Sequence, residues 1–372
     1  MASIFSFFKN KKSIPQETKT NIKEELANES NTEETPQDNV NASLEDNQET
    51  VRQKYDALSM NELILLSETG DAEAQNRLGY YYHTGENVDK DLKTAVMYWE
   101  MAAKQGLAKA QSNLASCYMN GQGVERNPQK AIGLWAEAAG KGYAPALTVV
   151  GTFFLQGVAF PQNFEKAVDL LTQAADQDYA QAQYNLGICY EQGLGVEQDD
   201  AVAAEWYQKS ADHDYTDAQY KLGRAFIFGN GVEEDHVKGM ELLNIAASKG
   251  HGRSMDILAS CYENGQGVPQ DREQALLWYE KAAKAGDAYG QYHLASIYAQ
   301  EQDIEKNAEK AVLLYEASAE QGHELSQYEL GKCYLMGIGT QVDEDKALFW
   351  LQQAFSQGNE EAENLLKQKN WI

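Results

Sequence analysis

The apolar positions of this chain recur with one fixed spacing of 36 residues. Each copy holds a large aliphatic residue followed by a small one, and an aromatic residue follows the small residue at the third position, as in Leu186, Gly187 and Tyr190. A period of this length indicates a solenoid, in which each unit buries its apolar face only against its neighbours. The eight aliphatic positions are Leu78, Leu114, Val150, Leu186, Leu222, Leu258, Leu294 and Leu330.

Each copy predicts two helices joined by a turn. The first helix contains the aliphatic-small pair, where a missing side chain permits close helix approach, and it ends at a Gly-x-Gly turn that needs positive φ. The second helix starts at an Asp or Asn whose side chain can accept hydrogen bonds from free helix amides. These starts are Asp91, Asn127, Asn163, Asp199, Asp235, Asp271, Asn307 and Asp343.

The predicted fold is an all-α solenoid of eight 36-residue helix-turn-helix repeats, residues 71–358, with a helical cap at each end. Residues 51–70 form the N-terminal cap, since Ser59 and Glu62 match a capping box before an apolar run. Residues 359–372 form the C-terminal cap, because they resemble one more first helix with Lys367 in the close-packing position. In the repeat that ends at Gly322, Glu301 and Asp303 replace the turn glycines, so we expect a changed turn there.

Residues 1–50 are predicted to form a disordered acidic tail with a short aromatic and basic tip. The tail lacks the apolar residues that would offset its ordering entropy. One interpretation of the tip is a weak contact with a membrane surface or a partner, and the other is a frayed terminus. The tip residues are Phe5, Phe7, Phe8, Lys9, Lys11 and Lys12.

The net charge of -26 and the pI near 4.6 argue against nucleic acid as a partner. The four cysteines lie 72 residues apart in one slot of alternate repeats, too far from each other for disulfides or zinc. We interpret them as small buried residues of a protein in a reducing compartment, and no signal peptide is evident. The expected location is cytoplasmic, with the tip allowing a peripheral place at the inner face of the membrane.

The order of small and aromatic positions resembles the tetratricopeptide repeat, but the turn is longer. A Gly-x-Gly-Val turn followed by an acidic cap and a Trp-Tyr pair, as in Gly193 to Val196, Asp199, Trp206 and Tyr207, is similar to the Sel-1-like repeat (SLR) family. The resemblance covers residues 71–358 and implies a right-handed α/α superhelix that acts as a bacterial or eukaryotic protein-interaction adaptor. The alternative it offers is a binder or hydrolase of cell-wall or β-lactam-like molecules; that secreted branch carries paired cysteines in each repeat, which this chain lacks.

By the same resemblance the first helices line a concave groove that binds a protein or peptide. Tyrosines two residues before the aliphatic position, with basic residues two after it, could hold an extended peptide or a helix by stacking and hydrogen bonds. Packing between neighbouring repeats explains such tyrosines equally well, and both interpretations stay open. The predicted partner-binding residues are Tyr184, Tyr220, Arg224, Tyr292, Tyr328 and Lys332.

The sequence contains no motif that indicates catalysis. No His-Glu-x-x-His pair, Gly-x-Ser-x-Gly elbow or Walker-type loop is present, so we predict a non-enzymatic protein with no catalytic residues, no cofactor and no metal. His251 and His323 occupy the same helix-start slot, which predicts a solvated capping role.

Overall fold

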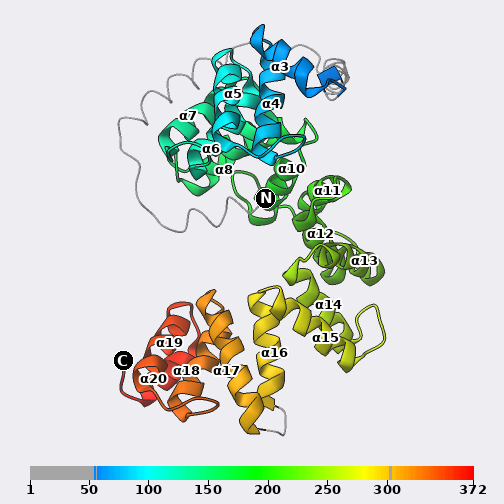
Figure 1. Cartoon of the computed structure of the whole chain (residues 1–372). Coiled ribbons are helices and arrows are strands. Elements are labelled where there is room, and N and C mark those ends of the chain that lie inside the picture. Colours follow the sequence, from blue (N-terminus) through cyan, green and yellow to red (C-terminus); the bar gives the residue numbers. More distant parts are fainter. Residues whose placement is uncertain (1–53, 56, 301–303) are drawn as a thin grey trace. The chain divides into compact units, whose positions relative to one another are not determined.

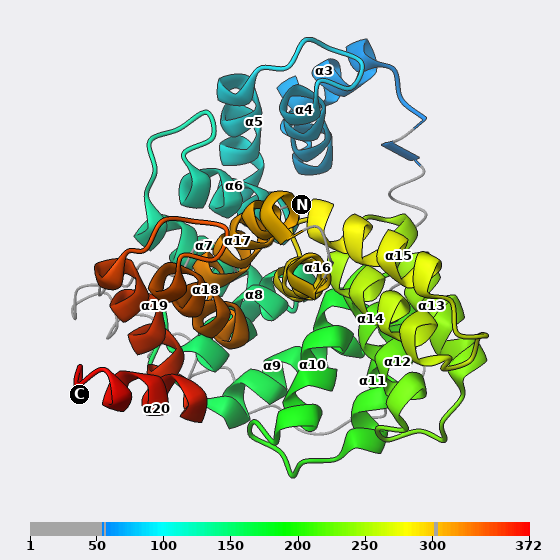
Figure 2. The same ribbon diagram turned by 90° about the horizontal axis from the view of Figure 1, so that it is seen from below.

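The computed structural model describes residues 54–55, 57–300 and 304–372, and within these ranges the regular secondary structure is helical (Figures 1 and 2). The chain divides into two compact units, residues 1–209 and 210–372. Unit 1 contains α3 (Met60–Glu68), α4 (Ala72–Thr84), α5 (Leu92–Lys104), α6 (Ala108–Asn120), α7 (Pro128–Gly140), α8 (Ala144–Gln156), α9 (Phe164–Ala175), α10 (Ala180–Gln192) and most of α11 (Asp200–Asp212). Unit 2 contains α12 (Thr216–Phe228), α13 (His236–Ser248), α14 (Gly252–Asn264), α15 (Arg272–Lys284), α16 (Ala288–Gln300), α17 (Ile304–Glu320), α18 (Glu324–Met336), α19 (Glu344–Ser356) and α20 (Glu360–Gln368).

The even-numbered helices from α4 to α18 are the predicted first helices, and the odd-numbered helices from α5 to α19 are the second helices. Local capping chemistry sets most of their boundaries as predicted. The Asn127 side chain accepts from the Lys130 amide, and Pro128 opens α7. Gly193 and Gly195 have φ of 65° and 75°, and Asp178 and Asp214 also have positive φ.

One predicted helix start is wrong. Asn307 lies inside α17, which begins at Ile304 and has 17 residues where most second helices have 13. The residues between Ile304 and Asn307 include no glycine or proline, so the helix extends one turn beyond the usual start. The changed turn that we expected at Glu301 and Asp303 lies outside the described residues.

Glycine permits close contact between the two helices of a repeat. A Cβ on Gly187 would lie 2.6 Å from the Tyr207 ring, and one on Gly331 would lie 2.7 Å from Leu351. The second turn glycine has a further role, since a Cβ on Gly195 would lie 2.5 Å from the Phe164 carbonyl group in the preceding repeat. Larger residues at these positions would force the helices apart.

Side chains near the C-terminus of several second helices join successive repeats. Lys141 Nζ donates to the Gly106 carbonyl oxygen at 2.7 Å and to Gln111 Oε1 at 3.0 Å. In unit 2, Gln357 makes the same two contacts, with Gly322 and Gln327. These bonds satisfy buried glutamines and a carbonyl at the end of the preceding helix, so they fix the register of adjacent repeats.

Helix α3 precedes the first repeat and helix α20 follows the last one. Ser59 and Glu62 make the capping box of α3, and the Asn359 side chain caps α20. The four cysteines are buried and free, and burial raises their thiol pKa values, to about 12 for Cys117. Residues 1–50, including the proposed tip, lie outside the described residues. None of the helices described is long and apolar enough to cross a membrane.

Candidate functional site

The structure places the six predicted partner-binding residues on first helices, and all six are half-buried. Tyr184 belongs to unit 1, where its ring lies 5.8 Å from that of Tyr207. The other five belong to unit 2, and several contact neighbouring rings and charges: Tyr220 packs on His251, Tyr292 on Tyr315 and His323, and Tyr328 under Lys332, which pairs with Glu329. Their role in binding a partner remains a prediction.

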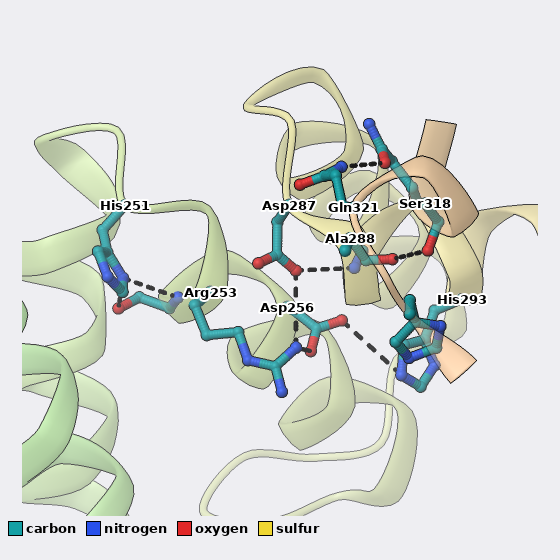
Figure 3. Close-up of polar contacts among 12 residues, drawn as sticks. His251, Arg253, Asp256, Asp287, Ala288, His293, Ser318 and Gln321 are labelled. Atoms are coloured by element: carbon teal, nitrogen blue, oxygen red, sulfur yellow. Dashed lines mark hydrogen bonds and ion pairs between the residues drawn. The ribbon is translucent and has the colours of Figure 1, made fainter. Parts of the chain in front are cut away.

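Between these residues, α14 and α16 carry a cluster of charged side chains that we call the Asp256 centre (Figure 3). It consists of Arg253 and Asp256 on α14, Asp287 at the start of α16, and Tyr289 and His293 on α16. The Arg253 Nη1 atom lies 3.6 Å from Asp256 Oδ2 and 3.8 Å from Asp287 Oδ2. Asp256 therefore sits between an arginine of its own helix and a histidine of the next first helix.

Asp256 is the least satisfied charged group of the centre. The residue is 7% exposed, and its buried Oδ1 atom accepts no hydrogen bond from the described residues. His293 Nε2 is 3.8 Å from this oxygen, beyond hydrogen-bond distance. Burial, followed by the negative charge of Asp287, raises the pKa of the Asp256 carboxyl to about 7, and Arg253 opposes the shift.

Arg253 is held in place by contact with an aromatic ring and by two nearby carboxylates. Its guanidinium carbon lies 3.0 Å from the centroid of the Tyr289 ring, and its buried Nη1 atom donates no hydrogen bond to the described residues. Asp287 also caps α16 by accepting from the Gly290 amide at 2.8 Å. The guanidinium thus occupies a cage of one aromatic ring and two carboxylates, and its donors are not engaged in ideal ion pairs.

Two histidines near the Asp256 centre lie at the starts of first helices, His251 before α14 and His323 before α18. His251 Nδ1 accepts from the Ser254 amide and His323 Nδ1 accepts from the Ser326 amide, which confirms the predicted capping role. The expectation that they are solvated is wrong, because both are half-buried: His251 packs on Tyr220, and His323 packs on Tyr289 and Tyr292. Burial lowers the pKa of both imidazoles, to about 4 for His323.

Sequence analysis did not select the Asp256 centre, although one signal was present. Asp256 is the only acid in the slot two residues before the aliphatic position. Its partners Asp287 and His293 are 31 and 37 residues away, which is close to one repeat, so adjacent first helices bring them together. A search for charged residues at one repeat spacing would have found the cluster.

A second surface of unit 2 carries exposed apolar side chains. Leu277, Leu313 and Phe349 occupy one slot of the second helices α15, α17 and α19, and Leu313 is 65% exposed. No group of three or more metal-ligating His, Cys, Asp or Glu side chains occurs in the part of the chain that the structure describes. Unit 2 therefore offers two surfaces that differ in chemistry, a polar aromatic one on first helices and an apolar one on second helices.

Comparison with protein families identifies the repeat. The Sel1 repeat model matches eight consecutive segments: 72–107, 108–143, 144–179, 180–215, 216–251, 253–287, 288–323 and 325–359. The chain therefore belongs to the Sel1 repeat family, and its fold is the all-α solenoid of helix-turn-helix repeats that the sequence predicts. No curated protein matches the chain.

Two solved structures support the same assignment. The Sel1 repeat protein from Oxalobacter formigenes is 28% identical with a TM-score of 0.58, and the match covers 86% of this chain and 92% of that one. The structure of c5321, a protective antigen of uropathogenic Escherichia coli with an SLR fold, is also 28% identical, with a TM-score of 0.56 and coverage of 82% and 73%. These likenesses extend over most of the repeats.

Proposed function

We propose that this protein is an interaction scaffold that binds a protein or peptide through first helices of unit 2. We call the surface that carries Tyr220, Arg253, Tyr289, Tyr292 and Tyr328 the first-helix face. The observation that carries the proposal is that Arg253 of α14 stacks on the exposed Tyr289 of α16, so a charge and an aromatic ring of adjacent repeats meet on this face. Aromatic and arginine side chains are the residues that dominate binding energy at protein interfaces.

Tyr289 is the strongest single anchor for a partner. Its side chain is 44% exposed although its ring contacts both Arg253 and His323. Leu325, which occupies the same slot one repeat later, is also exposed. An aromatic ring held in place by its neighbours loses little conformational entropy when a partner covers it. The predicted residues Arg224 and Lys332 would border this face, and Tyr184 of unit 1 would belong to a separate contact.

Photo-crosslinking tests the proposal directly. The full chain would carry p-benzoylphenylalanine in place of Tyr289 or, as a matched control on the second helices, in place of Leu313. We expect a defined protein adduct from position 289 in cells that make the protein, and loss of that adduct when Tyr220 and Tyr328 are also changed to alanine. Adducts from position 313 alone would assign binding to the second helices and contradict the proposal.

A further inference from the structure

We propose that the Asp256 centre binds a cationic side chain, a lysine ammonium or an arginine guanidinium, that the partner presents to the first-helix face. This inference rests on the proposed function and deepens it, because it states what chemistry the partner must carry. Three observations support it: the charge balance of the centre, the Asp256 oxygen that accepts no hydrogen bond from the described residues, and the way the centre already holds Arg253 of the chain itself.

The centre has more negative than positive charge. Asp256 and Asp287 supply two carboxylates, and Arg253 supplies one guanidinium between them. Burial lowers the pKa of His293, so the imidazole is neutral at pH 7 and adds no positive charge. The chain as a whole has a net charge of -26, which favours approach of a basic partner. One further cation would complete the pairing.

We place the partner's cation at the Asp256 Oδ1 atom. Buried carboxylate oxygens are normally hydrogen-bonded, and an exception calls for a specific explanation. This oxygen is buried, accepts no hydrogen bond from the described residues, and faces His293 Nε2 at 3.8 Å. The His293 side chain is 38% exposed. Because Oδ1 itself is buried, a basic side chain reaches it when the His293 imidazole moves aside.

The chain itself shows which chemistry the cage accepts. Arg253 lies flat on Tyr289 with both carboxylates at its edge, which is how aromatic rings and acids together hold a guanidinium. An anionic partner is disfavoured, because any anion that reaches Arg253 would also meet Asp256 and Asp287. A cation that reaches Asp256 meets an unpaired oxygen and the exposed Tyr289 ring.

Binding of a cation should be coupled to ionisation of Asp256. The groups that face this carboxyl are Arg253, Asp287 and His293, with Glu263 and Tyr279 also near enough to act on its charge or to feel it. A carboxyl with a pKa of about 7 is about one-tenth ionised at pH 6 and about nine-tenths ionised at pH 8. A cation binds the ionised form, so the affinity should rise about tenfold between pH 6 and pH 8.

The test is isothermal titration of the full chain with a short glycine-serine peptide that contains one arginine, compared with the same peptide containing neutral citrulline. At pH 8 we expect the arginine peptide to bind at least about tenfold more tightly, and to release a proton at pH 6.5, measured in buffers of different ionisation enthalpy. Asp256→Asn should abolish this preference. Asp345→Asn, an exposed carboxylate on α19, is the matched control and should leave it unchanged.

A second variant guards against misfolding as the cause of lost binding. Arg253→Gln removes the internal guanidinium that competes for the same carboxylates, and it also raises the pKa of Asp256 further. At a pH above that pKa the arginine peptide should therefore bind several-fold more tightly, a gain that misfolding cannot produce. Equal affinity for the arginine and citrulline peptides, or an affinity that does not change with pH, would overturn the inference. Crosslinking from position 289 would still decide the proposed function separately.

Discussion

One slot of the repeat, two residues before the aliphatic position, differs in chemistry between the first three repeats, in unit 1, and the sixth repeat, in unit 2. In the first three repeats the slot holds Asn76, Ser112 and Thr148, which are neutral and buried. Thr148 Oγ1 donates to the Ala144 carbonyl oxygen at 2.8 Å, so its helix satisfies it without a distant partner. In the sixth repeat the slot holds Asp256, which is also buried but has no neutral partner of this kind, whereas the other repeats of unit 2 hold a tyrosine there. The one charged residue in this slot has Arg253 one helical turn earlier on the same helix, so we infer that a nearby cation is what allows a buried charge there.

The repeat that contains Asp256 also lacks the bonds that join successive repeats elsewhere. Met255 occupies the glutamine position, and Ala285 occupies the position of Lys141 and Gln357. Both members of the pair are thus absent together, beside the charged centre. The sixth repeat therefore combines a buried charged cluster with the loss of a bond pair that holds other repeats in register.

Thr148→Asp should give the largest effect. The new carboxylate would be buried, and Pro145 stands where Arg253 stands relative to Asp256, so no cation of the same helix can pair with it. We expect a loss of about 4 kcal/mol of stability. Ser112→Asp should cost less, since Lys109 occupies the arginine position. Chemical denaturation followed by circular dichroism measures both, and equal losses would contradict the role given to the helical cation.

Arg253→Met should destabilise unit 2 by about 3 kcal/mol, because it leaves two adjacent carboxylates without their counter-charge. Hydrogen exchange measured by mass spectrometry would show faster exchange in α14 and α16 and no change in unit 1. The double variant with Asp256→Asn should recover much of the loss. If the two changes are additive, the pair is not coupled and the centre is not an ion-pair cluster.

Asp256→Asn should remove much of the dependence of the free energy of unfolding on pH. The folded-state pKa of Asp256 is raised above its usual value, so its contribution is fully present below about pH 4 and is lost as the pH rises through about 7. The wild type should therefore lose stability relative to the variant across this window. Denaturation at pH 4, 6 and 8 measures the difference, and a constant difference would show that the carboxyl titrates normally.

At acidic pH, His323→Asn should make the protein more stable than the wild type by about 1 kcal/mol. The pKa of His323 is lowered to about 4, so its contribution is present above about pH 6.5 and is lost as the pH falls through about 4, when a proton on Nδ1 removes the cap of α18. Asparagine caps helices without titrating in this range. Exchange rates in α18 should thus depend less on pH in the variant. Identical profiles would argue against acid-sensitive capping.

Adding the glutamine-lysine pair to the sixth repeat, which contains Asp256, should give the smallest effect. Met255→Gln alone buries a polar amide and should destabilise the protein, and Ala285→Lys alone should have little effect. Together they should show a favourable coupling of about 0.5–1 kcal/mol in a double-mutant cycle, because the lysine can donate to the glutamine as Lys141 does to Gln111. Zero coupling would show that the sixth repeat differs in backbone position as well as in sequence.

Much of the fold was predictable because its signals are local. Cap residues such as Asn127, turn glycines such as Gly193 and the capping box at Ser59 act within a few residues of themselves. The start of α17 was not predicted, because a good cap residue such as Asn307 stops being a cap when the preceding residues can also be helical. The functional prediction chose tyrosines by position, and position alone does not show whether a ring faces a partner or a neighbouring repeat.

The sequence by itself determined that this protein is a stack of eight helical pairs, because each repeat carries its own starts, stops and close-packing positions. Only the tertiary structure determined the burial and the protonation of the Asp256 carboxyl. Its charge state depends on burial and on Asp287, which belongs to the next repeat along the chain and reaches it only after the helices have packed. Helix boundaries are set by bonds between near residues, whereas pKa values and unsatisfied oxygens are set by everything that surrounds a group in space.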